Sequence, residues 1–192
     1  MSDRRTQIAE GGIRILASRG VRALTHRAID ETLGLAAGST SYYARTRRDL
    51  IALIVDRLAE RTTDDLVAQR IPEAPTPQTL ASMLVTALDA TMARADDHRA
   101  RLILLLECRN DPELQTSLAT RPEVRHAIVE VTTTLLEKLG VDEPNAHAGD
   151  LAGLLDGLLM QRIIRTAPID EERVITAYLT GLPRGQRPAA EG

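Results

Sequence analysis

Apolar residues recur with the spacing of amphipathic helices along most of the chain. Between residues 3 and 19, three large apolar side chains fall on one helical stripe, and Gly20 follows as a helix stop. A second, shorter helix is predicted over residues 26–33, because Thr25 can cap its start and Gly34 after its end suits a left-handed turn. The N-terminal part of the chain is therefore predicted to begin with two helices.

A third short helix is predicted over residues 39–45, after a linker that contains Gly38. Thr46 then opens a fourth helix, with Asp49 three residues later in a capping-box pattern ahead of the apolar run LIALIVDRLAE. Two short helices joined by a glycine-containing turn are the outline of a helix-turn-helix. This pattern is the first feature of the chain that points to a function.

Proline residues mark the main boundary of the chain. The segment IPEAPTPQ interrupts the helical pattern, and within it Thr76 can cap a new helix whose first position is Pro77. Later helices are predicted at about residues 77–95, 97–109, 122–139, 146–166 and 170–182. We expect an all-α fold of about nine to ten helices, with a helix-turn-helix domain at 1–50, a linking helix at 47–70, a second domain at 76–182 and a disordered tail at 183–192.

Composition supports this helical interpretation. Hydrophobic residues make up 43% of the chain and charged residues 27%, as in ordinary globular proteins. The apolar share comes from Ala, Leu, Ile and Val, and the low aromatic content of 2% favours helices over sheets. Cys108 is the single cysteine, which excludes an intrachain disulfide, and the chain has no uncharged apolar stretch of about 18 residues. We expect a cytoplasmic protein that is not exported and does not span a membrane.

Charge is distributed unevenly along the chain. Residues 1–50 hold nine arginines against five acidic residues, a net charge of +4, whereas residues 51–192 carry a net charge of −7. The total of −3 argues weakly against binding to nucleic acid. The basic N-terminal part, however, has the charge that binding to a polyanion requires.

Residues 25–47 contain the side chains that a DNA-reading helix needs. Such a helix has to be open enough to enter a major groove about 12 Å wide, and it has to present hydrogen-bonding groups. The small residues and the hydrogen-bonding residues of this stretch are, in turn, Gly38, Ser39, Thr40 and Ser41, and Tyr42, Tyr43, Arg45 and Arg47. The chain has no Phe or Trp and yet places two of its three tyrosines side by side in this stretch. We therefore expect at least one of them to contact DNA.

The stretch LTHRAIDETLGLAAGSTSYYARTRRDL, residues 24–50, resembles the DNA-binding domain of the tetracycline-repressor (TetR) family. The usual family pattern G-T-L-Y-Y-H-F-K-S-K-E-E-L falls on residues 38–50 without a gap, with matches at Gly38, Tyr42 and Leu50. The resemblance implies contacts to phosphate or to the groove from Thr25 and Arg27, to base edges from Ala37, Gly38, Ser39, Thr40 and Ser41, and to the DNA backbone from Tyr43 and Arg47.

Three positions depart from the family pattern. Ser41 stands where the family has its first Tyr, Tyr43 where it has His or Tyr, and Ala44 where it has a Phe that fills the small core. Two interpretations of Tyr42 therefore stay open: it fills the core in place of that Phe, or it lies at the surface. Tyr43, on the neighbouring face, is expected to contact a phosphate.

The segment GDLAGLLDGLLMQRII carries a leucine stripe, at residues 151–159, and glycines at every fourth position on another face. A glycine costs about 1 kcal/mol in a helix, so this repetition suggests a close helix approach. The family resemblance implies a homodimer whose four-helix interface includes Ile128, Val131, Leu135, Gly149, Gly153 and Gly157. The alternative is that the leucine stripe packs within one subunit.

The resemblance also implies that the second domain encloses a pocket for a small-molecule effector, lined by Met83, Leu105, Cys108 and Met160. Because Tyr178 is the one aromatic residue outside residues 1–50, we expect an aliphatic or modestly polar effector. The expected function is that of a repressor that binds an inverted-repeat operator in double-stranded DNA as a homodimer. The alternatives are an activator and an architectural DNA-binding protein without an effector.

Catalytic motifs are missing from the sequence. The four histidines have no metal-ligand spacing, and the chain has no G-x-S-x-G, no P-loop and no G-x-G-x-x-G. Cys108 lies in an apolar run without a histidine partner, so a core position is favoured over a nucleophile. We therefore predict that the protein is not an enzyme and has no cofactor or metal site.

Overall fold

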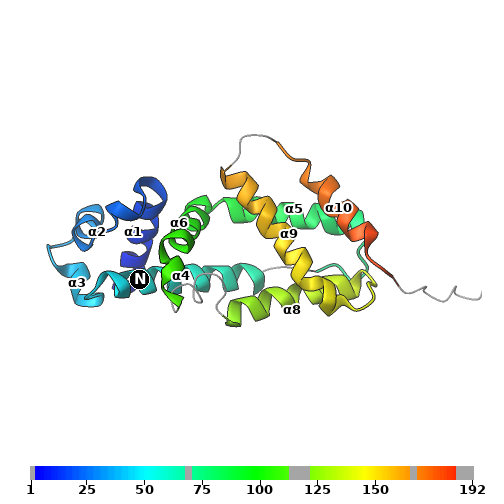
Figure 1. Ribbon diagram of the computed structural model, residues 1–192, viewed down its shortest axis with the longest axis horizontal. Coiled ribbons are helices and arrows are strands. Elements are labelled where there is room, and N and C mark those ends of the chain that lie inside the picture. The colour runs from blue at the N-terminus through cyan, green and yellow to red at the C-terminus, as the bar shows by residue number, and fades with distance from the viewer. Residues whose placement is uncertain (1–2, 68–70, 113–121, 165–167, 185–192) are drawn as a thin grey trace, which may run out of the picture. The chain divides into compact units, whose positions relative to one another are not determined.

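A computed structural model describes residues 3–67, 71–112, 122–164 and 168–184 of the chain. These residues form helices and connecting turns, with one isolated β-bridge between Val141 and Arg184 (Figure 1). The predicted all-α fold class is confirmed. None of the described helices is both long enough and apolar enough to cross a membrane. The predicted tail lies outside the described residues from position 185 onward.

The chain divides into two compact units. Unit 1 contains residues 1–67 and 94–125, and unit 2 contains residues 68–93 and 126–192. The sequence pattern placed 94–125 in the second domain, but contacts group this segment with the N-terminal helices. The reason is that residues 100, 104 and 108 bury their side chains in the same core as the first and fourth helices.

Unit 1 contains the helices that the sequence pattern predicts and two short 3-10 turns that it does not. Its first elements along the chain are α1 (Arg4–Arg19), the 3-10 turn η1 (Val21–Ala23), α2 (His26–Leu33), α3 (Ser39–Tyr43) and α4 (Arg47–Val67). The chain then passes through residues 68–93 of unit 2 and returns to unit 1 with α6 (Ala95–Glu107) and the 3-10 turn η2 (Cys108–Asn110). The predicted caps are present: the Thr25 hydroxyl accepts the Ala28 N–H at 3.1 Å, and Thr46 and Asp49 form a reciprocal capping box at 2.9 and 3.0 Å.

The core of unit 1 lies between α1, α4 and α6. Ile8 and Leu16 on α1, Ile54 on α4 and Leu104 on α6 are fully buried. Helices α1 and α4 approach each other closely at Gly12, where a Cβ atom would lie 2.4 Å from Ile54 Cδ1. Glycine at this position therefore allows the close packing of the two helices.

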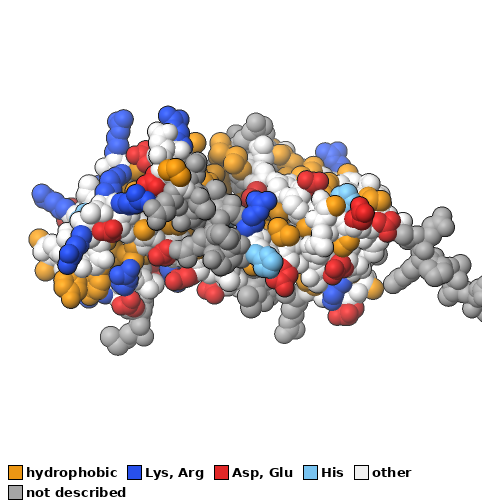
Figure 2. Space-filling model, turned by 60° about the horizontal axis from the view of Figure 1, so that its bottom comes forward, with side chains coloured by type: hydrophobic (Ala, Val, Ile, Leu, Met, Phe, Trp, Pro, Cys, Tyr) orange, Lys and Arg blue, Asp and Glu red, His pale blue; other side chains and the backbone are white. Residues whose placement is uncertain are grey.

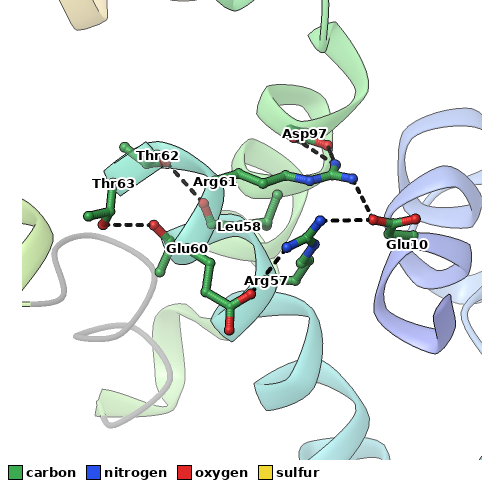
Figure 3. A network of polar contacts seen from close by, with 9 residues as sticks. Glu10, Arg57, Leu58, Glu60, Arg61, Thr62, Thr63 and Asp97 are labelled. Atoms are coloured by element: carbon green, nitrogen blue, oxygen red, sulfur yellow. Dashed lines mark hydrogen bonds and ion pairs between the residues drawn. The ribbon is translucent and has the colours of Figure 1, made fainter. Parts of the chain in front are cut away.

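A polar network joins the same three helices beside this core (Figure 3). On α4, Arg61 donates to both oxygens of Asp97 on α6, at 2.7 and 2.9 Å, and to Glu10 Oε1 on α1 at 2.8 Å. Arg57, one turn earlier, donates to the same Glu10 oxygen at 3.0 Å. The Asp97 side chain is 10% exposed, so hydrogen bonds from these partners take the place of water around its carboxylate.

Unit 2 is built from α5 (Pro77–Met92), most of α8 (Pro122–Lys138), α9 (Pro144–Ile164) and α10 (Glu171–Gly181) (Figure 1). The predicted cap is again present, since Thr76 and Thr79 form a capping box and Pro77 occupies the first turn. The core is fully apolar at its centre, with Leu80, Leu136, Leu151, Ile175 and Leu179 completely buried.

Arg162 ties three helices of unit 2 together. From α9 it donates to Asp89 of α5 at 2.7 Å, and its Nε donates to Glu171 of α10 at 2.8 and 3.0 Å. These hydrogen bonds raise the pKa of Arg162, which stays charged. The sequence pattern had offered this arginine no structural role, because Glu171 and Asp89 lie 9 and 73 positions away from it, on other helices.

Candidate nucleic-acid interface

Helices α2 and α3 form the turn that the sequence pattern predicted. Gly34 ends α2 with a φ of 64°, and Gly38 begins α3 with a φ of 89°, both in the left-handed region that favours glycine. Between them the chain turns through hydrogen bonds from Leu35 N to Asp30 O at 2.8 Å and from Ser39 N to Ala36 O at 3.1 Å. The five-residue α3 is thereby presented against α2.

Two side chains of α2 hold α3. Asp30, which is 4% exposed, accepts the N–H groups of Gly38 and Thr40 at 2.8 and 2.9 Å and the Thr40 hydroxyl at 2.6 Å. Burial raises the pKa of Asp30, but these hydrogen bonds and the nearby His26 outweigh burial and hold the pKa below its usual value. His26 Nε2 donates to Ala44 O at 2.8 Å.

The outer surface of this motif is small, polar and basic. Ala37, Gly38 and Ser41 are exposed, and the Arg27 side chain is 88% exposed with its Nε donating to Glu31 at 2.7 Å. Figure 2 shows Lys and Arg side chains gathered around α1, α2 and α3, at the left of the view. This surface combines an open helix with positive charge, which binding in a DNA groove requires.

Several of the predicted contact residues also have structural partners within unit 1, among them Thr40 and Arg47. Thr40 was expected to face base edges, but it is fully buried and its hydroxyl is bonded to Asp30. Arg47 was expected to grip phosphate, but its guanidinium donates to the carbonyl oxygens of Leu24 and Val21 at 2.6 and 2.9 Å. The first expectation is corrected for the Thr40 side chain, and the phosphate contact of Arg47 stays a prediction.

The two tyrosines lie on different faces of α3. Tyr42 is 82% exposed, so it does not fill the core. Tyr43 is half-buried and packs against the core of unit 1, and its ring meets the edge of Tyr42 at a centroid distance of 5.1 Å. Ala44, which is 2% exposed, leaves room for this arrangement.

Tyr42, which the sequence left open between core and surface and to which no particular DNA contact was assigned, is a surface residue. The signal was present in the spacing: Thr40, Tyr43 and Ala44 occupy positions i, i+3 and i+4, which is one face of a helix. Since that face is turned inward, Tyr42 has to point outward. It joins Ser41 as an exposed hydrogen-bonding side chain of α3.

The predicted dimer residues divide into exposed and buried groups. Gly149, Gly153 and Gly157 are exposed, and a Cβ atom added at any of them would meet no other described part of the chain within 4 Å. Leu135 is 3% exposed and belongs to the core of unit 2, which removes it from the surface. The leucine stripe of α9 also packs inside unit 2, with Leu151, Leu158 and Leu159 buried. This agrees with the alternative that the stripe packs within one subunit. Ile128 and Val131 are half-buried.

The four predicted effector residues do not gather in one unit. Leu105 packs against the core of unit 1 and Cys108 is buried within it, whereas Met83 is half-buried in unit 2 and Met160 is 45% exposed there. Burial, with Asp111 and Glu107 nearby, raises the pKa of the Cys108 thiol, so this thiol is a poor nucleophile. Among the described residues, no group of three or more acidic, histidine or cysteine side chains is placed to hold a metal ion.

Sequence and fold comparisons connect this geometry with known proteins. Residues 75–185 match the family model described as "Tetracyclin repressor-like, C-terminal domain". The HTH-type transcriptional regulator BetI of Rhizobium meliloti (strain 1021) is similar to the chain, with 21% identity over 169 residues, or 88% of this chain and 82% of BetI.

Solved structures share the whole fold. A transcriptional regulator from Rhodococcus sp. Rha1 has a TM-score of 0.73 at 18% identity, and the match covers 94% of this chain and 96% of the Rhodococcus protein. The multidrug binding protein EbrR, complexed with imidazole, has a TM-score of 0.67 at 25% identity, with coverages of 96% and 98%. The family model matches more than half of the chain, and the structure has a helix-turn-helix where the motif of residues 24–50 predicted one. The chain therefore belongs to the tetracycline-repressor family of transcriptional regulators.

Proposed function

We propose that this protein is a cytoplasmic repressor that binds an inverted-repeat operator as a homodimer and is released by a small-molecule effector. The observation that carries the proposal is the surface of α3, where Ser41 and Tyr42 are exposed on a helix anchored from behind by α2. Ala37 and Gly38 leave the approach to this helix open. In a twofold dimer the two α3 helices would enter successive major grooves about 34–36 Å apart.

Replacement of Arg27 by Gln is expected to weaken binding to operator and scrambled duplexes alike. Arg27 is highly exposed beside the motif, so its loss removes a phosphate contact and flattens the salt dependence by about 0.9 per contact, or roughly twice that in a dimer. Fluorescence anisotropy at several salt concentrations measures both quantities. The matched control is Arg173→Gln, which removes the same charge from an exposed position of unit 2.

The base-reading part of the proposal has its own variant. Ser41→Ala should leave binding to scrambled DNA nearly unchanged and alter the preference at particular bases, since one lost base contact is worth about 1–3 kcal/mol of discrimination. The interface proposal would be contradicted if Arg27→Gln and Arg173→Gln had equal effects and Ser41→Ala changed no preference.

An effector is proposed because EbrR, a relative at 25% identity, is a multidrug binding protein in complex with imidazole. In unit 2, the side chains available for such a molecule are mostly aliphatic, with Met83, Met92 and Tyr178 half-buried at the edge of the core. An aliphatic or modestly polar effector suits these side chains better than a flat aromatic cation.

Replacement of Gly157 by Leu is expected to shift a homodimer towards monomer. A Cβ atom added at any of the three glycines of α9 would meet none of the described atoms outside its own helix within 4 Å, yet each glycine costs about 1 kcal/mol in a helix. A second subunit packed on this face would explain them. A leucine there would overfill the interface and make the free energy of dimerisation less favourable by about 1–3 kcal/mol. Analytical ultracentrifugation measures the shift, with Thr86→Leu on the exposed surface of α5 as control. An unchanged dimer would place the interface elsewhere.

A further inference from the structure

The start of α3 lacks a cap of its own. Its N-cap residue is Gly38, which has no side chain, and no side-chain cap comes from within the helix. The first N–H groups of a helix have no intrahelical partner and need one when they are shielded from water. Asp30 supplies it from the preceding helix, since it accepts the N–H groups of Gly38 and Thr40 with different oxygens.

The end of α3 is held from the same helix. Its C-cap residue, Ala44, is 2% exposed, and its carbonyl oxygen accepts a hydrogen bond from His26 Nε2 at 2.8 Å. His26 and Asp30 are four residues apart on α2 and so lie on one face of it. Two neighbouring side chains of α2 thus reach the two ends of α3.

A helix of five residues has little stability of its own. Isolated helices shorter than about 12–15 residues are marginal in water, so tertiary contacts have to set the orientation of α3. The inward contacts of Thr40, Tyr43 and Ala44 fix which face is buried. The bonds from Asp30 and His26 add fixed points at the two ends, which apolar packing alone does not provide.

We propose that Asp30 and His26 are positioning residues for DNA recognition, which touch no DNA but set the register and orientation at which α3 presents Ser41 and Tyr42. The inference rests on the proposed function. It predicts that weakening these bonds impairs the discrimination between DNA sequences more than it impairs DNA binding as such, because base contacts need exact geometry whereas phosphate contacts tolerate small shifts.

The test compares Thr40→Val with Thr40→Ser. Valine keeps the shape of threonine but removes the hydroxyl that donates to Asp30 Oδ1, whereas serine keeps the donor. The probes are a duplex selected from random DNA by the wild-type protein and a scrambled duplex of the same composition. Thr40→Val is expected to lower the affinity for the selected duplex about tenfold and to leave the scrambled duplex within about twofold. Thr40→Ser is expected to retain the wild-type ratio.

Two further variants address each end of α3. Asp30→Asn turns one acceptor into a donor that faces N–H groups, and His26→Leu removes the bond to Ala44 O. Both should lower the ratio of selected to scrambled affinity, and Asp30→Asn should speed amide hydrogen exchange at Gly38 and Thr40 but not in α1. The control is Thr32→Val, because Thr32 is an exposed residue whose hydroxyl donates within α2, to Ala28 O at 2.7 Å.

The outcomes separate the two proposals. A wild-type chain that selects no duplex contradicts the proposed function and removes the basis of this inference. A wild-type chain that selects a duplex, with Thr40→Val and Asp30→Asn variants that keep the wild-type ratio, contradicts the positioning role alone. Equal losses for both duplexes, with uniformly faster exchange throughout unit 1, show a general stabilising role and also overturn it.

Discussion

Replacement of Arg61 by Met is expected to lower the free energy of unfolding of unit 1 by about 3 kcal/mol. The variant leaves Asp97, with a side chain 10% exposed, without the two hydrogen bonds at 2.7 and 2.9 Å that now offset its burial. Arg94 Nε remains 3.3 Å from one Asp97 oxygen, and Glu10 keeps its ion pair with Arg57. The expected loss of stability is therefore at the low end of the range for breaking a buried ion pair. Urea unfolding followed by circular dichroism measures the change.

A matched variant distinguishes this effect from the loss of any arginine. Arg99 pairs with Asp96 on the surface of the same α6, where the two side chains are 48% and 55% exposed. Arg99→Met should therefore change stability by less than about 1 kcal/mol. The double variant Arg61→Met/Asp97→Leu should regain part of the loss, since no carboxylate is left buried without its partner. Equal effects of Arg61→Met and Arg99→Met would show that the network is not important for stability.

Replacement of Gly12 by Val is expected to destabilise unit 1 by about 1–3 kcal/mol and to abolish DNA binding at temperatures where the wild type is folded. The new Cβ would lie 2.4 Å from Ile54 Cδ1 and 2.9 Å from Ile54 Cγ1, and Ile54 is completely buried and has little room to move. The helices α1 and α4 would have to separate. Thermal unfolding and anisotropy on a scrambled duplex test the two parts of this expectation.

The neighbouring glycine is the control for Gly12. A Cβ atom at Gly11 would lie 3.3 Å from the side chain of Leu33, which is half-buried and can shift. Gly11→Ala should therefore have a smaller effect than Gly12→Val. Ile54→Ala should lessen the cost of Gly12→Val, because it removes the atoms in conflict, and the two changes should then be less than additive. Strict additivity would mean that the close approach is not the cause.

Helix positions and caps could be predicted from the sequence because the groups that form them are neighbours along the chain. The Thr25 cap, the Thr46 and Asp49 capping box, and the left-handed Gly34 each involve residues within about four positions of one another. The TetR resemblance was likewise carried by one uninterrupted stretch, residues 24–50. Local patterns of this kind do not depend on how distant parts of the chain pack.

The interior of the candidate site could not be predicted in the same way. Thr40 is a small polar residue in an open stretch, and its spacing to Tyr43 and Ala44 indicates that they share a helix face but not that this face is buried. Its partner Asp30 was not singled out at all, since a carboxylate on a short helix is ordinarily solvated. Only the turn between α2 and α3 brings the two together across ten positions.

By itself, the sequence determined the helices to within about three residues at their ends, because short-range hydrogen bonds and apolar periodicity specify them, and the motif of residues 24–50 indicated the helix-turn-helix and the family. The tertiary structure decided which face of α3 is presented, that Tyr42 lies outside and Tyr43 packs inward, that Arg47 binds carbonyl groups, and that α6 belongs with α1 and α4. Those outcomes depend on pairs as distant as Arg61 and Asp97, 36 positions apart. The physical reason is that burial and ion pairing are decided by the neighbours of a side chain in space, which periodicity along the chain does not specify.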